Sequence, residues 1–348
     1  MRTAAFQKPA DLCLQAQEAV DQNEPVLLRS PVEIDLLLEF ARSTSHGLRL
    51  DPPALECRFL YDERGCDLFE EICRLDEYYP TRTERTILEQ HSSDIRAITG
   101  PVTLIELGSG SSVKTDLLLR AYLESDGTVP YVPVDVSDSA LRSALKSISA
   151  CHHEARLVGV NSTYEEAFPL FEALSPVMVI FLGSTIGNLD REEFDRFLED
   201  LTDGLAPGDF FLLGADLVKE AGIIERAYND ERGITAEFMK NLFVRMNREL
   251  GSGVDLTAVE HEAKWNRQRE QVELYARFTL PQTIRVGPLD EVFTFEAGDR
   301  ILLEISRKFV LLDLERSLER FGLKRESVYT DEKDWFALLL LRKVEPGD

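Results

Sequence analysis

Residues 102–115, with the sequence VTLIELGSGSSVKT, decide the fold of this chain. VTLIEL (102–107) is a short apolar run typical of a buried strand, and Gly108 and Gly110 follow it directly. The helix-like segment VKTDLLLRAYL (113–123) comes next. A strand, a glycine-rich turn and a helix in this order are typical of the first unit of a parallel sheet that binds a ligand at the turn.

The alternation of strands and helices continues beyond this unit. The apolar segments that we expect to form strands are 131–136, 155–160, 176–182 and 209–217. Helix-like segments lie between them, the clearest being SDSALRSALKSISA (137–150) and the amphipathic REEFDRFLEDLTDGL (191–205). Strands that alternate with helices indicate βαβ units, so we predict an α/β fold with a doubly wound, Rossmann-like sheet.

The alternation stops near residue 218. Helices are predicted within 220–250, antiparallel strands within 270–306, a helix at 310–322 and a final strand at WFALLLLRK (335–343). Residues 1–60 read as helices and loops. We therefore expect a sheet domain built from 82–218 and 309–348, and a second α+β domain built from 1–81 and an insertion at 219–308.

Composition and charge exclude several classes of function. The 348 residues carry a formal net charge of −24, which disfavours binding to nucleic acid or to an anionic membrane surface. No apolar run reaches the ~18 residues needed to span a bilayer, and the N-terminus lacks the apolar core of a signal peptide. The five cysteines form no CxxC pair, and Cys151-His152-His153 reads as a helix end. We expect a cytoplasmic monomer without a metal.

Three ligand motifs can be tested against the glycine loop. A P-loop needs glycine before Lys114-Thr115, and a dinucleotide fingerprint needs a third glycine, but Val113 occupies both positions. The E-x-G-x-G loop of S-adenosylmethionine (SAM) methyltransferases fits Glu106, Gly108 and Gly110. An acid at the end of the second strand can accept both ribose hydroxyls, and Asp135 has that position. An ordinary βα turn with a solvated aspartate is the alternative.

Several longer segments are unusual enough to identify a family. The chain resembles the histidine Nα-methyltransferases of ergothioneine biosynthesis, which form hercynine from histidine and SAM. The resemblance runs from about residue 55 to the C-terminus and rests on YDERGCDLFEEI (61–72), DEYYPTRTE (76–84), IELGSGSSVKT (105–115), FLGSTIGNL (181–189), ADLVKE (215–220), RAYND (226–230) and LEISRKF (303–309). It implies a Rossmann-like methyltransferase domain with a separate substrate-binding domain.

The resemblance assigns the amino-acid carboxylate to Tyr78, Asn188 and Tyr228, and the imidazole ring to Glu304 and Ser306. Two phenols and an amide supply hydrogen-bond donors without a fixed charge, as a carboxylate requires. Taken alone, Asn188 reads as well as a cap of the following helix. Strand alternation would place Leu302, Glu304 and Ser306 on one face. A solvated face whose glutamate pairs with Arg307 or Lys308 remains an alternative.

The resemblance further puts Tyr61 near the reacting amine and near the cofactor, and Phe69 and Gly183 in the substrate site. Tyr61 would orient the amine or help to remove a proton, while Phe69 reads equally well as part of a helix core. The implied cofactor residues are Gly108, Lys114, Asp135 and Thr163.

Two positions depart from the family pattern. Thr163 replaces the aspartate expected to bind the adenine amino group, and Leu274 replaces an expected methionine of similar volume. The first departure bears on cofactor affinity and the second only on packing around the substrate ring.

Other activities remain to be compared with histidine methylation. The nearest is the same chemistry on another aromatic amino acid or derived amine, which would not need the pair Glu304 and Ser306. A SAM-binding module without catalysis and a nicotinamide oxidoreductase belong to other classes, and Val113 disfavours the second.

Overall fold

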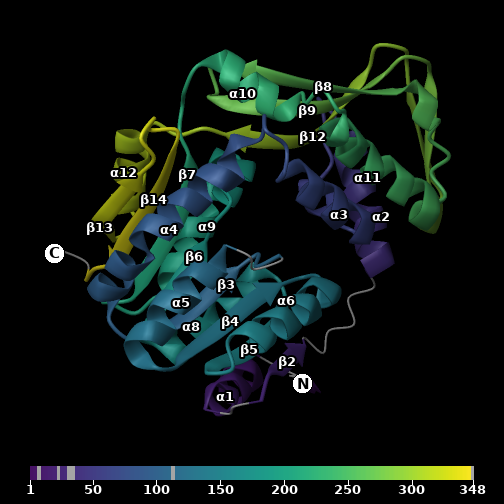
Figure 1. The fold of residues 1–348 in the computed structure, drawn as a ribbon. Coiled ribbons are helices and arrows are strands. Elements are labelled where there is room, and N and C mark those ends of the chain that lie inside the picture. Colours follow the sequence, from purple (N-terminus) through teal and green to yellow (C-terminus); the bar gives the residue numbers. More distant parts are fainter. Residues whose placement is uncertain (6–8, 22–23, 30–35, 111–113, 346–348) are drawn as a thin grey trace.

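The computed structural model describes residues 1–5, 9–21, 24–29, 36–110 and 114–345. Its centre is a nine-stranded sheet with the strand order β1-β2-β5-β4-β3-β6-β7-β14-β13 (Figure 1). Strands β1 to β7 are parallel, β14 runs antiparallel to β7, and β13 runs antiparallel to β14. Their bounds are β1 Arg2–Ala5, β2 Val26–Arg29, β3 Thr103–Leu107, β4 Val129–Asp135, β5 Ala155–Asn161, β6 Val177–Phe181, β7 Phe210–Asp216, β13 Leu323–Thr330 and β14 Phe336–Lys343.

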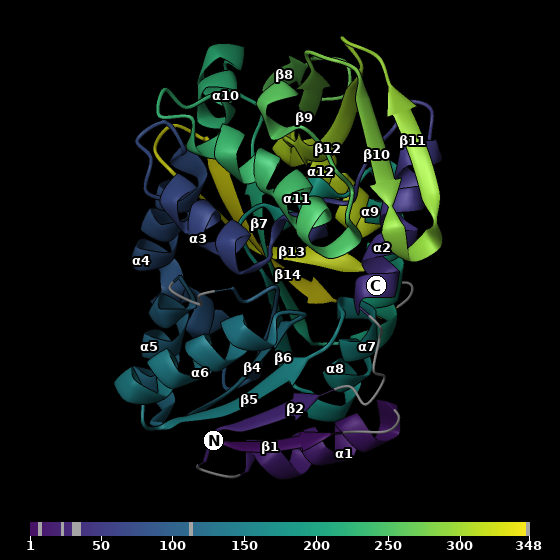
Figure 2. The same ribbon diagram turned by 90° about the vertical axis from the view of Figure 1, so that its right-hand side faces the viewer.

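Helices cover both faces of this sheet, as Figure 2 shows. One face packs against α4 (Tyr79–Thr99), α5 (Thr115–Asp126) and α6 (Asp138–Cys151). The other packs against α1 (Pro9–Val20), α7 (Tyr164–Ala167), α8 (Pro169–Leu174), α9 (Arg191–Gly204) and α12 (Leu311–Glu319). Alternate residues of β3 enter the two cores, because neighbouring side chains of a strand point to opposite faces.

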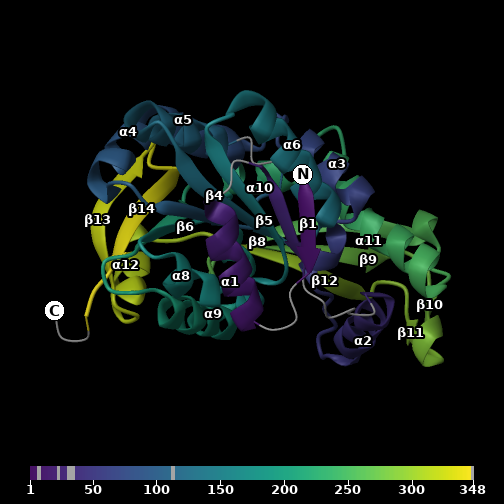
Figure 3. The ribbon, with the colours of Figure 1, turned by 90° about the horizontal axis from the view of Figure 1, so that it is seen from below.

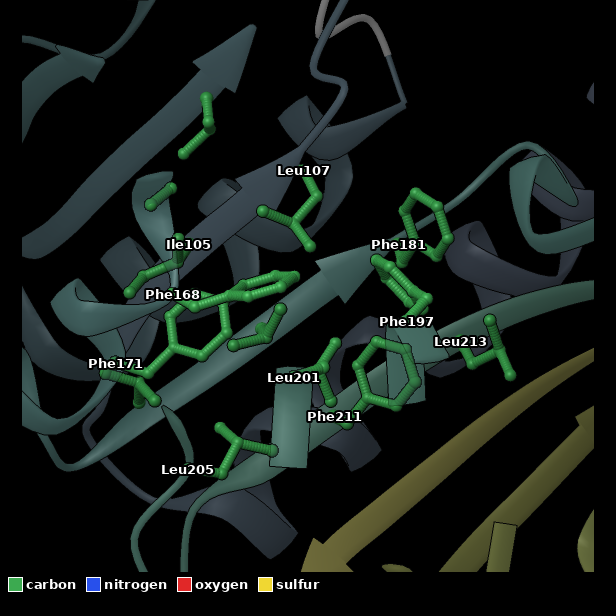
Figure 4. Close-up of a cluster of buried hydrophobic side chains, with 14 of the residues drawn as sticks. Ile105, Leu107, Phe168, Phe171, Phe181, Phe197, Leu201, Leu205, Phe211 and Leu213 are labelled. Atoms are coloured by element: carbon green, nitrogen blue, oxygen red, sulfur yellow. The ribbon is translucent and has the colours of Figure 1, made fainter. Parts of the chain in front are cut away.

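Aromatic side chains fill much of the core beneath α8 and α9. Phe181 and Phe197 stack with ring centroids 5.0 Å apart, and Phe168 lies 6.0 Å from Phe197 (Figure 4). Leu107, the last residue of β3, belongs to the same cluster. The glycine loop therefore starts from a rigid, fully packed strand end.

The predicted α/β sheet is confirmed, and the apolar runs from 102 to 217 form β3 to β7. The helix predicted at 191–205 is α9, and WFALLLLRK contains β14. Four strands were not predicted: β1, β2, β8 (Val259–Asn266) and β13. Cys151 ends α6, as expected of a helix end.

The N-terminal segment differs from its prediction. Residues 1–60 were expected to be helices and loops within the substrate-binding domain, but β1 and β2 extend the central sheet beside β5 (Figure 3). Leu12 and Ala16 of α1 and Val26 of β2 are buried in the core of that sheet. The assignment of 1–81 to the second domain is therefore wrong for residues before about 30, because the exposed edge of β5 pairs with β2.

The second domain has its own core. It combines α2 (Leu36–Arg49) and α3 (Glu63–Ile72) with the insertion. The insertion contributes α10 (Ala221–Tyr228), α11 (Ile234–Leu250), a three-stranded antiparallel sheet in the order β12-β9-β8, and the hairpin β10-β11 (upper part of Figure 1). The remaining strand bounds are β9 Gln271–Phe278, β10 Gln282–Val286, β11 Glu291–Phe295 and β12 Arg300–Arg307. Short 3-10 helices occur at Cys57–Leu60 (η1), Thr185–Asn188 (η2), Leu256–Ala258 (η3) and Gly287–Leu289 (η4).

The insertion leaves and re-enters the sheet domain at one place. Leu217 and Phe309 form an isolated parallel bridge, and the backbone N–H of Val218 donates to the carbonyl of Phe309 at 3.0 Å. This junction lies at the end of β7, next to Asp216. Among the described residues, no helix combines the length and the apolar character needed to cross a membrane.

Candidate active site between the two domains

The carboxyl ends of the parallel strands meet at one edge of the central sheet. β3, β4, β6 and β7 end at Leu107, Asp135, Phe181 and Asp216. Order reverses at β3, which has β4 on one side and β6 on the other. Ligands of doubly wound sheets bind at such a reversal, outside the carboxyl ends.

The glycine loop has the backbone geometry that its sequence requires. Gly108 has φ +69°, and a Cβ built on it would lie 2.5 Å from Oη of Tyr164. The N–H of Gly110 donates to Oδ2 of Asp135 at 3.1 Å. A side chain at Gly108 would therefore meet both backbone strain and a steric clash. Val113, on which the exclusion of the other motifs rested, lies outside the described residues.

Glu106 supports this loop from below. It is buried, and its carboxylate accepts hydrogen bonds from Oγ1 of Thr115 at 2.6 Å and from the hydroxyl of Tyr131. Burial raises the pKa of Glu106 to about 7, against the opposing effect of these two donors. Both carboxylate oxygens are used within the protein, so Glu106 ties the end of β3 to the start of α5.

Asp135 is placed where an acid can hold vicinal hydroxyls. Its Oδ1 accepts from the N–H of Ser137 at 2.9 Å, and its Oδ2 accepts from Gly110. Burial raises the pKa of Asp135 against these backbone donors. Because each carboxylate oxygen accepts more than one hydrogen bond, both retain capacity for a ligand hydroxyl.

Thr163 serves as the N-cap of α7. Its Oγ1 accepts from the N–H of Glu166 at 3.4 Å, and its own N–H donates to Oε2 of Glu166 at 3.3 Å. This reciprocal capping box uses one lone pair of the hydroxyl. Whether Thr163 contacts adenine stays a prediction.

Lys114 is paired inside the protein. Its ammonium forms an ion pair with the fully buried carboxylate of Glu84 on α4, which also accepts the N–H of Gly183 at 2.8 and 3.0 Å. Burial acts to lower the pKa of Lys114, and the charge of Glu84 raises it above its ordinary value. Glu84 thus joins the glycine loop to the loop that follows β6, a role that the sequence analysis missed.

Aromatic side chains from both parts of the second domain contact one another in a row. Tyr61 and Phe69 meet edge to face with centroids 5.5 Å apart, Phe69 and Tyr78 at 6.3 Å, and Tyr78 and Tyr228 at 6.0 Å. Phe238, which the sequence analysis did not single out, lies 5.3 Å from Tyr61. The structure therefore brings together four of the predicted residues in one continuous row.

Burial raises the pKa of Tyr61 well above its ordinary value, and the charge of Glu304 acts in the same direction. The pKa of Tyr78 is raised in the same way, first by burial. Both phenols are therefore neutral near pH 7 and act as hydrogen-bond donors or acceptors without charge.

Glu304 and Ser306 lie on the same face of β12, opposite Leu274 and Val272 of β9. Leu302 pairs with Tyr275 instead, because a β-bulge shifts the register between Leu302 and Glu304. The prediction that Leu302 shares their face is therefore wrong, since a bulge interrupts the period of two. Leu274 is fully buried against this face.

Glu304 carries an unsatisfied buried oxygen. Its Oε2 has no hydrogen-bond partner among the described residues, and burial raises its pKa to about 7 while Lys308 opposes that shift. The sequence left open an ion pair of Glu304 with Lys308 or Arg307. The ion pairs among the described residues do not include it, and Lys308 pairs instead with Asp216 at 2.9 Å. A buried carboxylate without a donor calls for a ligand that supplies one.

Ser306 belongs to a buried polar network. Its Oγ lies 2.8 Å from Oη of Tyr228, and Nζ of Lys308 donates to both oxygens. Asp216 accepts from the hydroxyl of Tyr79 at 2.8 Å and pairs with Lys219 as well as Lys308. Lys308 and Asp216 lie in the segments LEISRKF and ADLVKE, but the sequence did not indicate that they pair with each other.

Asn188 ends η2 beside β12. A Cβ on the preceding Gly187 would lie 2.8 Å from the carbonyl oxygen of Arg307, so η2 packs directly on this strand. The cap of α9 is Asp190, whose side chain accepts from two N–H groups at 2.9 Å. The alternative role of Asn188 as the cap of this helix is therefore wrong.

The residues at the glycine loop fit SAM. Gly108 is left-handed and Asp135 ends the neighbouring strand, which suits a ligand with a ribose. SAM has no pyrophosphate, so it does not require a third glycine. Within the described part of the chain, no group of three or more His, Cys, Asp or Glu side chains is arranged to hold a metal ion.

Comparisons with known proteins agree with this geometry. A family model described as histidine-specific, SAM-dependent methyltransferase matches residues 40–343. A histidine N-alpha-methyltransferase of Mycolicibacterium smegmatis is 42% identical over 86% of this chain and 93% of its own length. One of Mycobacterium tuberculosis is 38% identical over 88% and 95%. Ergothioneine biosynthesis protein 1 of Neurospora crassa is 31% identical over 90% of this chain but only 36% of its own length.

Proposed function

Because this chain belongs to the histidine-specific, SAM-dependent methyltransferase family, we propose that its interdomain site methylates Nα of L-histidine three times and releases hercynine. The protein is a SAM-dependent N-methyltransferase, and histidine methylation is the step that ergothioneine synthesis requires. The roles of individual residues, the number of transfers, and a cytoplasmic, monomeric enzyme are parts of the proposal.

One observation carries the choice of substrate: the orphaned Oε2 of Glu304, buried beside a row of aromatic rings. An imidazole N–H supplies the missing donor, and the second ring nitrogen bonds to Ser306 on the same strand face. A phenyl ring has no such donor, and an indole has one N–H but no second ring nitrogen to bond to Ser306.

The carboxylate of histidine takes donors from Tyr78, Asn188 and Tyr228. Tyr78 and Tyr228 are both buried, with 8% and 6% of their surface exposed. Charge-neutral donors in a buried setting bind a carboxylate strongly, because water does not compete for it. This contact and the ring contact together fix the position of the amine between them.

When bound, SAM supplies an electrophilic methyl carbon on a sulfonium. Gly108, Lys114, Asp135, Thr163 and Tyr61 are the residues that we assign to it. The amine attacks with its lone pair, so it must first lose a proton, and the same holds before the second and third transfers. Tyr61 orients the amine and passes this proton towards water. The rings of Tyr61 and Phe69 stabilise the growing methylammonium through their faces.

The test is incubation of the purified protein with SAM and an equimolar mixture of the twenty amino acids, analysed by mass spectrometry. Three methyl additions to histidine alone are expected. Methylation of another aromatic amino acid or amine would overturn the roles of Glu304 and Ser306. SAM binding without any methylated product would instead favour a non-catalytic module.

A matched pair of variants tests the site directly. Glu304→Gln is expected to raise KM for histidine by roughly ten- to a hundredfold, because the charged acceptor is lost. Glu273→Gln, which changes a glutamate on the neighbouring strand β9, is the control and should leave KM near that of the parent protein.

A further inference from the structure

We propose that Lys308 is a positioning residue that couples recognition of the histidine carboxylate to recognition of the imidazole ring. The inference rests on the proposed function, in which Tyr228 contacts the carboxylate and Ser306 contacts the ring. Lys308 itself contacts neither; it acts through these two hydroxyl groups.

The contacts of Lys308 are complete without substrate. Its Nζ donates to Oη of Tyr228 at 2.8 Å and to Oγ of Ser306 at 2.7 Å, and it lies 2.9 Å from Oδ2 of Asp216. Its side chain is only 1% exposed. An ammonium group has three N–H donors, so one acceptor takes each of them and the side chain has a single arrangement.

This arrangement restricts the two hydroxyls. An ammonium never accepts a hydrogen bond, so Tyr228 and Ser306 must both accept from Lys308. They also lie 2.8 Å from each other, and that bond uses the proton of one of them. One hydroxyl proton remains for the substrate, so when Tyr228 donates to the carboxylate, Ser306 donates to Tyr228 and can only accept from an N–H of the ring. The two recognition contacts are therefore linked through Lys308.

The charge of the cluster supports the same role. Asp216 is shared by Lys308 and Lys219, whose side chains are 1% and 4% exposed. The charge of Lys219 also interacts with Asp331, and that of Lys308 with Glu304. Of the two cations, only Lys308 contacts Tyr228, so the histidine carboxylate bound at Tyr228 would lie next to the charge of Lys308.

The experiment is a double-mutant cycle on steady-state kinetics with histidine. Lys308→Met and Ser306→Ala are each expected to lower kcat/KM by about 10- to 100-fold, mainly through KM. The double variant S306A/K308M should lose little more than the larger single loss, because Lys308 acts through Ser306. Multiplying losses in the double variant would overturn the inference.

Lys219→Met is the matched control. The substitution removes the second lysine that pairs with Asp216 and leaves Asp216 paired with Lys308. Lys219 contacts Tyr79 and the carbonyl of Leu217, and it does not contact the hydroxyls of Tyr228 and Ser306. K219M should keep KM for histidine within about twofold of the parent value. Equal effects of K219M and K308M on KM would show a general structural role and overturn the inference.

Binding of S-adenosylhomocysteine by calorimetry separates misfolding from positioning, since K308M should bind it like the parent protein. If K308M fails to bind it, Lys308→Arg keeps the charge and should recover part of the histidine affinity; no recovery in a folded K308R would count against the inference. If S306A and Tyr228→Phe leave kcat/KM unchanged, the proposed site fails, and the inference with it. If they lower it and K308M does not, only the inference fails.

Discussion

The backbone N–H of Gly183 donates to both carboxylate oxygens of Glu84, at 2.8 and 3.0 Å, and the same carboxylate pairs with Lys114. Glu84 is fully buried in α4, so a helix at the border of the two domains holds both loops of the cofactor edge. Removal of this one charge should loosen both loops together.

Glu84→Gln is therefore expected to lower the free energy of unfolding by about 2 kcal/mol, because Lys114 loses its partner but keeps some access to water. It should also weaken binding of S-adenosylhomocysteine. Urea unfolding and calorimetry measure the two effects. Glu89→Gln in the same helix is the control, because it removes only an exposed ion pair with Arg85. If E89Q lowered the free energy of unfolding as much as E84Q, the special role of Glu84 would be refuted.

Gly108→Ala should nearly abolish cofactor binding. The new methyl group would meet Tyr164 at 2.5 Å in a left-handed backbone conformation, at the position where the ligand approaches. Gly251→Ala has a similar φ of +64° but no atom within 4 Å, so it isolates the cost of strain, about 1 kcal/mol. Equal binding of S-adenosylhomocysteine by the two variants would contradict the assignment of the loop.

Thr163→Asp should tighten SAM binding several-fold. Aspartate caps a helix as well as threonine does, so α7 should keep its stability, and its carboxylate offers an acceptor to the adenine amino group. Thr163→Ser serves as the control for a small change at the cap. Calorimetric affinity equal to that of the parent protein would show that residue 163 does not face adenine.

Glu304 makes stability depend on pH in a direction opposite to most carboxylates. Its pKa is raised by burial from 4.5 to about 7, so between these values the folded protein keeps a proton that the unfolded chain releases. The associated stabilisation is complete below about pH 4.5 and is lost as the pH rises through 7. Relative to Glu304→Gln, the parent protein should lose about 1–3 kcal/mol over this range in urea unfolding. Parallel pH profiles would mean that the carboxylate is solvated.

Tyr61→Phe should slow methyl transfer by about 10- to 100-fold because the hydroxyl is lost, with a much smaller effect on binding of S-adenosylhomocysteine because the ring is retained. Mono- and dimethylhistidine should accumulate, since each later transfer also needs a deprotonated amine. Mass spectrometry of the products over time measures this. Tyr275→Phe, whose hydroxyl bonds to Glu273, is the control; unchanged product ratios in Y61F would remove the catalytic role.

The sheet could be predicted from the sequence because β3 to β7 and β14 are buried on both faces and read as continuous apolar runs. β1 and β2 have only four residues each, too few to show a hydrophobic period. β8 carries a polar residue at every second position and is only partly buried. These elements are defined by their neighbours in the sheet and not by their own composition.

The candidate site also combines features that local sequence predicts with features that depend on the folded chain. The positions of Gly108 and Asp135 follow from the order of strand, turn and acid, which is local in sequence. The bulge that places Leu302 opposite Tyr275 depends on the partner strand, and no residue type marks it. The partners of Lys308 come from three separate segments, so only the folded chain shows that Tyr228, Ser306 and Asp216 converge on one ammonium.

The bridge between Leu217 and Phe309 has a consequence for how such proteins diversify. The chain leaves the sheet domain at Leu217 and returns to it at Phe309, and these two residues are neighbours in space. The two ends of the excursion are therefore held together by the sheet domain. Its length and content can change without moving β7 relative to β14. The part of the proposed amine site that lies in this excursion, with Tyr228, Glu304 and Ser306, could therefore change while the sheet domain is retained.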